Sequence, residues 1–109
     1  MLQIKKVSVL GAGLMGNQIA MQIALHGYQV VCYDISEVML QKAADFSADW
    51  FSRRVKKRKM GAEEAAEIQS RLHFTTDVRT AAADADIVME AVSDIVQIKK
   101  SALSNFDQY

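Results

Sequence analysis

The chain has 109 residues, half of them hydrophobic, which is enough for one domain with a hydrophobic core. Its 13 basic and 13 acidic residues balance, so the composition excludes a general electrostatic preference for nucleic acid or an anionic membrane. A single cysteine excludes a disulfide framework, and we find no signal peptide or membrane-spanning segment. These features predict a cytoplasmic location, or an organelle matrix if a transit peptide has been removed.

A glycine-rich loop, Gly11-Ala12-Gly13-Leu14-Met15-Gly16, follows the first predicted strand and precedes a helical pattern. The spacing Gly-x-Gly-x-x-Gly in this context is typical of dinucleotide-binding sites. Gly11 is expected to allow the tight turn, Gly13 the approach of a pyrophosphate, and Gly16 the close packing of the helix on the strand. The loop alone could also be no more than a tight turn.

The helix after the loop is predicted from apolar residues at helical spacing, and it is expected to stop at Gly27. Its first backbone N–H groups, those of Leu14 and Met15, are expected to face the phosphates at the positive end of the helix dipole. No basic side chain is needed in the loop for this, and none is present there.

Residues 28–34 are predicted to form a buried parallel strand with Asp34 at its end. A carboxylate at this place is expected to bind the adenosine ribose, and the alternative is a surface carboxylate that caps the next helix. Residues 35–37 contain no Arg or Lys for a 2′-phosphate, so the pattern favours NAD over NADP. Cys32 in this strand is expected to be a small buried apolar residue.

Ser36 is predicted to cap a long helix that ends near Lys59, and Gly61 to break it before a shorter helix. This hairpin is far longer than a simple crossover helix of about ten to fifteen residues. We therefore predict an α/β fold of the Rossmann type, a doubly wound parallel sheet. It is incomplete, with about four strands, and carries a long helical-hairpin insertion after the second strand.

Two more strands are predicted, over residues 73–76 and 87–92, with a short helix capped by Asp77 between them. A last helix is expected from about Ile95 to the end. In the strand order 3-2-1-4 the fourth strand would be an apolar edge, through which the isolated chain is expected to dimerise or aggregate.

These features together resemble the start of an L-3-hydroxyacyl-CoA dehydrogenase, a family that includes 3-hydroxybutyryl-CoA dehydrogenases. The resemblance spans essentially the whole chain and is carried by the glycine-rich loop, Asp34, the helical hairpin, Thr75-Thr76-Asp77 and Val88-Met89-Glu90-Ala91-Val92. It implies oxidation of (S)-3-hydroxyacyl-CoA to 3-oxoacyl-CoA with NAD, as in fatty-acid β-oxidation or butyryl-CoA-type metabolism.

In that family an NAD-binding domain is joined to a helical C-terminal domain. The resemblance implies that residues 1–109 are the N-terminal part of the NAD-binding domain, with the rest of that domain and the helical domain absent. The family's catalytic histidine and glutamate come from later motifs, so this chain is expected to be inactive alone. Its own histidines, His26 and His73, are expected to be structural.

The resemblance implies a set of cofactor-binding residues and no metal site. The set is Gly11, Gly13, Leu14, Met15, Gly16, Asp34, Glu90, Ala91, Val92, Asp94 and Lys99. Among these, Asp94 stands where the family usually has glutamate, and Lys99 occupies the family's lysine position in the following helix.

The basic run of residues 53–59 has three interpretations. It could be the solvated end of a helix, where cations are favourable, or a nucleic-acid contact. The resemblance implies a third, in which Lys57, Arg58 or Lys59 pairs with the phosphates of an acyl-CoA substrate. The expected partners are therefore acyl-CoA and, in the full-length enzyme, a second copy of the chain, but neither nucleic acid nor membrane.

Two alternatives remain open on the sequence. One is another NAD-dependent dehydrogenase, of the β-hydroxyacid, 6-phosphogluconate or gulonate type, because such enzymes also use a Gly-x-Gly-x-Met-Gly loop. The long hairpin with its basic end argues against the first two. The other is a nucleotide-binding or interaction module that carries out no chemistry.

Overall fold

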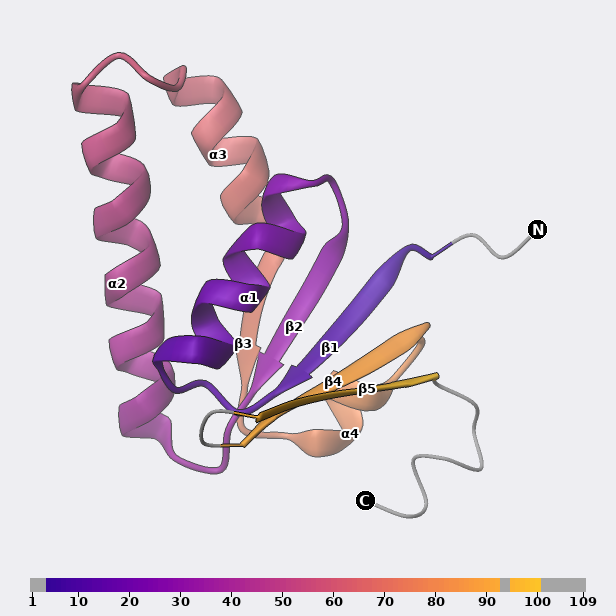
Figure 1. The fold of residues 1–109 in the computed structure, drawn as a ribbon. Helices are drawn as coiled ribbons and strands as arrows, with labels where there is room; N and C mark the ends of the chain where they lie inside the picture. Colours follow the sequence, from indigo (N-terminus) through magenta and orange to yellow (C-terminus); the bar gives the residue numbers. More distant parts are fainter. Residues whose placement is uncertain (1–3, 93–94, 101–109) are drawn as a thin grey trace.

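The structure, a computed structural model, describes residues 4–92 and 95–100 and contains one mixed sheet with helices on both faces (Figure 1). The strands are β1 (Lys6–Leu10), β2 (Gln29–Tyr33), β3 (Leu72–Thr75), β4 (Ile87–Val92) and β5 (Ile95–Lys100). The helices are α1 (Leu14–Leu25), α2 (Glu37–Lys56), α3 (Ala62–Ser70) and α4 (Val78–Ala82). The sheet order is β3-β2-β1-β4-β5, with β1 to β4 parallel. The predicted Rossmann-type architecture with a helical hairpin after the second strand is confirmed.

The main core lies between the sheet and helices α1, α2 and α3, which cover the same face (Figure 1). Val9 on β1 and Val30 and Cys32 on β2 point into it, and each is fully buried. Ala20 and Ala24 on α1 are also fully buried, and their small side chains allow the helix to lie close to the strands. Helix α4 covers the opposite face, where the buried Ser8 hydroxyl donates to the carbonyl of Ala81.

The helical hairpin begins as predicted, since the Ser36 hydroxyl accepts a hydrogen bond from the N–H of Met39, 3.2 Å away. Helix α2 ends at Lys56, three residues before the predicted end. The chain leaves it through Arg58, which adopts a left-handed conformation with φ of 57°. Gly61 is the N-cap of α3 and has an ordinary negative φ, so the left-handed turn comes from Arg58 and not from the glycine.

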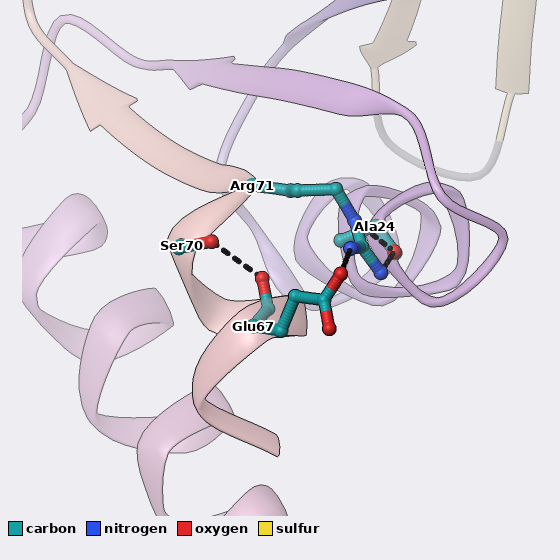
Figure 2. A network of polar contacts seen from close by, with 4 residues as sticks. All are labelled: Ala24, Glu67, Ser70 and Arg71. Atoms are coloured by element: carbon teal, nitrogen blue, oxygen red, sulfur yellow. Dashed lines mark hydrogen bonds and ion pairs between the residues drawn. The ribbon is translucent and has the colours of Figure 1, made fainter. Parts of the chain in front are cut away.

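Arg71, at the C-terminal end of α3, joins the hairpin to α1 (Figure 2). Its Nε and Nη2 donate to the carbonyl oxygen of Ala24, at 3.1 and 2.9 Å, and Nη1 lies 3.5 Å from Glu67 Oε1. The Ala24 carbonyl belongs to the last turn of α1, where it also accepts from the N–H of Gly27 at 3.1 Å and where the helix dipole favours a cation. Arg71 therefore fixes the position of α1 relative to α3.

The predicted last helix is wrong for residues 95–100, which form β5 antiparallel to β4. Three of its first four residues are β-branched, and a β-branched run of this length is compatible with either helix or strand until a partner is available. Pairing with β4 supplies that partner. The rest of the predicted helix, residues 101–109, lies outside the described residues.

Because β5 pairs along the whole of β4, β4 is not an open edge of the sheet. The predicted association of the isolated chain through β4 therefore loses its structural basis. The outer edge on this side of the sheet is β5.

Candidate functional site

The glycine-rich loop, Asp34 and the end of β4 meet at one edge of the sheet, where the parallel strands end. Leu10, the last residue of β1, lies beside Tyr33 of β2 on one side and Glu90 of β4 on the other. The glycine-rich loop follows Leu10, and Asp34 follows Tyr33, so both reach the same edge next to the start of α1 (Figure 1). Open α/β sheets bind ligands at this edge.

Gly11 and Gly16 are required by close backbone packing. Gly11 has a φ of +111°, and its N–H donates to the carbonyl of Tyr33 at 2.7 Å. A Cβ on Gly11 would overlap the carbonyl oxygen of Ala91, and a Cβ on Gly16 would overlap the carbonyl oxygen of Gly11. The structure thus confirms the tight turn at Gly11 and the close packing of the helix at Gly16.

Gly13 differs from the other two glycines of the loop because the space beside it is open. A Cβ there would meet only the Cε of Met39, at 3.9 Å. Gly13 is also the N-cap of α1, and no side chain in the described part of the chain caps this helix. The first N–H groups of α1, including those of Leu14 and Met15, therefore keep their hydrogen-bonding capacity for a ligand.

Asp34 is half-buried and connects the two loops at the edge. Its Oδ2 accepts from the N–H of Ala12 at 2.9 Å, and its Oδ1 accepts from the N–H of Ser36 at 2.8 Å. Ser36, and not Asp34, caps α2. A carboxylate has about four lone-pair sites, so each oxygen of Asp34 retains one for a ligand hydroxyl.

Cys32 is confirmed as a small buried residue. It is fully buried, and its Sγ lies 3.8 Å from the carbonyl oxygen of Gly11. Burial, with a smaller contribution from the nearby Asp34 carboxylate, raises the pKa of the Cys32 thiol to about 12. The thiol is therefore neutral near pH 7 and is not a nucleophile.

The cofactor residues predicted in and after the fourth strand are only partly confirmed in position. Glu90 and Ala91 are half-buried at the end of β4, and the backbone of Val92 pairs with Ile95. Asp94 lies outside the described residues. Lys99 is in β5 with its backbone opposite Val88, so its predicted place in a helix is wrong.

The basic end of the hairpin forms a hollow of about 220 Å³. Its lining residues are Trp50, Arg53, Arg54, Lys57 and Lys59. The Arg54 guanidinium lies 5.0 Å from the centre of the Trp50 ring, while Arg53 pairs with Asp49 at 2.6 Å. The structure thus brings Lys57 and Lys59 together, whereas Arg58 does not line this hollow.

Two further features were missed in the sequence. Lys42 of α2 lines a second hollow beside Gly13, although no basic residue is present in the loop itself. An apolar groove of about 450 Å³ lies between α1 and α2, with Ile19, Phe46 and Trp50 among its lining residues. Both depend on the packing of α1 against α2, for which the local sequence pattern carries no signal.

Two kinds of feature are absent from the described part of the chain. None of its helices combines the length and apolarity needed to cross a bilayer. No three His, Cys, Asp or Glu residues within it are arranged to hold a metal ion.

Comparison with known proteins identifies the family. The sequence profile described as "3-hydroxyacyl-CoA dehydrogenase, NAD binding domain" matches residues 6–109. The chain belongs to this family. The matched domain binds NAD, and the matched residues include both the glycine-rich loop and Asp34 described above.

Relatives of this NAD-binding domain are much longer proteins. It is 40% identical over 101 residues to 3-hydroxyadipyl-CoA dehydrogenase of Escherichia coli (strain K12), which covers 93% of this chain and 21% of that protein. It is 35% identical over 107 residues to the glyoxysomal fatty acid beta-oxidation multifunctional protein MFP-a of Cucumis sativus, covering 98% and 15% respectively. The chain thus spans about a fifth or less of the length of these curated relatives.

Solved structures agree with the fold. The crystal structure of 3-hydroxybutyryl-CoA dehydrogenase from Escherichia coli K12 matches with a TM-score of 0.79 and 40% identity, over 86% of this chain and 20% of that one. The crystal structure of (S)-3-hydroxybutyryl-CoA dehydrogenase PaaH1 from Ralstonia eutropha matches with a TM-score of 0.77 and 35% identity, over 85% of this chain and 32% of that one.

Proposed function

We propose that this chain is the N-terminal part of the NAD-binding domain of an enzyme that oxidises (S)-3-hydroxyacyl-CoA to 3-oxoacyl-CoA. Membership of the family supports this proposal. The observation that carries it is the uncapped start of α1 beside the Asp34 carboxylate, which leaves phosphate donors and hydroxyl acceptors next to each other. The rest of the NAD-binding domain and the helical domain would come from sequence outside these 109 residues.

In this proposal the chain binds and orients the ADP half of NAD, and NAD supplies the hydride acceptor. The N–H groups of Leu14 and Met15 bind the pyrophosphate, and the open space at Gly13 lets it approach the backbone. The two free lone-pair sites of Asp34 accept from the ribose hydroxyls.

Further along the cofactor we place Glu90, Ala91 and Val92, with Asp94 and Lys99 as additional contacts. The support for the first three is their position at the carboxyl end of β4. We assign no catalytic residue to this chain.

Titration calorimetry with NAD, ADP-ribose and NADP tests the cofactor proposal. NAD and ADP-ribose are expected to bind with similar affinity because the N–H groups at the start of α1 and the Asp34 carboxylate contact the half that they share. NADP is expected to bind more weakly, since its 2′-phosphate would meet the Asp34 carboxylate and no adjacent Arg or Lys. A chain that is folded by circular dichroism and binds none of the three would contradict the proposal and favour a module without chemistry.

We also propose that the hollow at the basic end of the hairpin binds the phosphates of acyl-CoA through Lys57 and Lys59. Arg58, which does not line it, would contribute only from the adjoining turn. The support is the convergence of these lysines with Arg53 and Arg54 around one hollow.

CoA titration of the double variant Lys57→Gln/Lys59→Gln tests this hollow. Affinity for CoA is expected to fall by about tenfold or more, because two cations facing the phosphates are removed. Lys56→Gln, which removes the neighbouring cation at the end of α2 outside the hollow, is the control. Equal losses in both proteins would indicate a general charge effect and favour the solvated helix end.

For the full-length enzyme we propose a cytoplasmic location and a homodimer, with neither nucleic acid nor membrane as a partner. The balanced charge of the chain supports the absence of a nucleic-acid partner. Relatives include a protein named as glyoxysomal, so an organelle matrix is the other compartment to be tested.

A further inference from the structure

We propose that Lys42, on α2, is a further contact for the pyrophosphate of the dinucleotide, with Asn17 Oδ1 as the acceptor that orients its ammonium group. The inference rests on the proposed function and deepens it. The glycine-rich loop contains no cation, and the inference assigns this role to a lysine on α2, the helix that follows β2.

The argument begins with a hollow of about 190 Å³ beside the glycine-rich loop. One wall is formed by the loop and the start of α1, and the other by the first half of α2. Its lining residues are Ala12, Gly13, Leu14, Asn17, Met39, Lys42, Ala43 and Phe46. A water molecule takes about 30 Å³ in the liquid, so the hollow holds a group of several heavy atoms but not a whole dinucleotide.

Asn17, which lines this hollow, has an unsatisfied hydrogen-bond acceptor. The residue is only 2% exposed, and its Nδ2 donates to the carbonyl of Ala43 at 3.1 Å. Its Oδ1 is buried and has no hydrogen-bond partner within the described part of the chain. Buried acceptors in native proteins nearly always have a donor, so the structure calls for an N–H or O–H group at this place.

Lys42 can supply that donor. Its side chain is exposed, and among residues 4–92 and 95–100 it forms neither a hydrogen bond nor an ion pair. Asp45, the acidic residue closest to it in sequence, accepts from Gln41 instead, at 2.9 Å. Met39 and Phe46 provide apolar walls along which the four-carbon stem of the lysine can lie.

The ammonium group of lysine has three donors, so it can bind two different acceptors at the same time. One donor can bind Asn17 Oδ1, and the others can bind oxygens of a phosphate group held at the N-terminus of α1. A phosphate near pH 7 brings only acceptors, so it could not satisfy Asn17 by itself. One ammonium group at this place would therefore satisfy both Asn17 and the phosphate.

The position of the hollow favours the pyrophosphate of the dinucleotide over the diphosphate of CoA. Gly13 and Leu14, which line it, belong to the loop that is proposed to bind NAD. Lys57, the first of the two lysines proposed to bind CoA, is fifteen residues further along the chain, which corresponds to about 22 Å at the helical rise per residue.

Titration of three variants with NAD, ADP-ribose and CoA tests the inference. Lys42→Gln removes the charge and is expected to weaken NAD and ADP-ribose binding by about tenfold, with CoA unchanged. Lys42→Arg keeps the charge and is expected to restore most of the affinity. Lys56→Gln removes a lysine from the same helix away from the hollow, and it is expected to bind NAD like the unchanged chain.

The outcomes separate this inference from the proposed function. If the unchanged chain binds NAD and Lys42→Gln binds it equally well, the inference is overturned and the proposed function stands. A loss for CoA alone, or an equal loss in Lys56→Gln, also overturns it. Failure of the unchanged, folded chain to bind NAD overturns both.

Discussion

Replacing Gly16 by alanine is expected to lower the free energy of unfolding by about 3 kcal/mol or more and to abolish NAD binding. The added Cβ would overlap the carbonyl oxygen of Gly11 and would press against the Cβ of Ala91 at 3.3 Å. Both contacts involve backbone or β-carbon positions, which cannot move away as the end of a flexible side chain can. Helix α1 would have to shift away from β1 and β4, and its N-terminal N–H groups would move with it.

Urea denaturation followed by circular dichroism measures this loss, with Gly61→Ala as the matched control. Gly61 has a φ of −73° at the N-cap of α3, and a Cβ there would meet nothing within 4 Å. Its replacement is expected to change stability by less than about 1 kcal/mol. Similar midpoints for the two variants would contradict the packing argument for Gly16.

The features that could be predicted from the sequence are those with a local chemical signal. The glycine-rich loop, the cap at Ser36 and the carboxylate at Asp34 each depend on a few neighbouring residues, and the structure places all three where the sequence indicates. The parallel strands follow from short apolar runs between turn residues. These signals suffice to predict the fold class and the edge of the sheet that holds the site.

The features that could not be predicted depend on contacts between distant segments. Residues 95–100 become a strand because β4 offers an unpaired edge, and their own pattern does not distinguish strand from helix. The end of α2 depends on a left-handed Arg58, a conformation that arginine rarely adopts. Asn17 and Lys42 line one hollow only because α1 packs against α2.

The hydrogen bond between Asp34 and the glycine-rich loop also depends on contact between distant segments. A ribose-binding carboxylate was predicted at the end of the second strand, but its hydrogen bond to the N–H of Ala12 joins residues 22 positions apart. Asp34 can therefore contribute to NAD binding in two ways. It can accept from the ribose directly, and it can hold the glycine-rich loop in the shape that receives the pyrophosphate.

Replacing Asp34 by asparagine is expected to weaken NAD and ADP-ribose binding by about 10- to 100-fold, which is the loss of a charge-assisted hydrogen bond of about 1.5–3 kcal/mol. The asparagine keeps one side-chain oxygen that can accept from the N–H of Ala12, so the glycine-rich loop is expected to keep its shape, whereas the hydrogen bond from the N–H of Ser36 is lost. Calorimetric titration measures the change, with Glu37→Gln as a control that removes a nearby exposed carboxylate from the first turn of α2.

The ratio of NADP to NAD affinity distinguishes the two roles of Asp34. If the carboxylate faces the ribose, it repels a 2′-phosphate, and its neutralisation raises this ratio even as NAD affinity falls. If Asp34 only shapes the loop, the asparagine changes the affinity for both dinucleotides equally or for neither, because both have the same pyrophosphate, and the ratio stays constant. A constant ratio with an unchanged unfolding midpoint would contradict the ribose contact, and a raised ratio would support Asp34 as the residue that selects NAD.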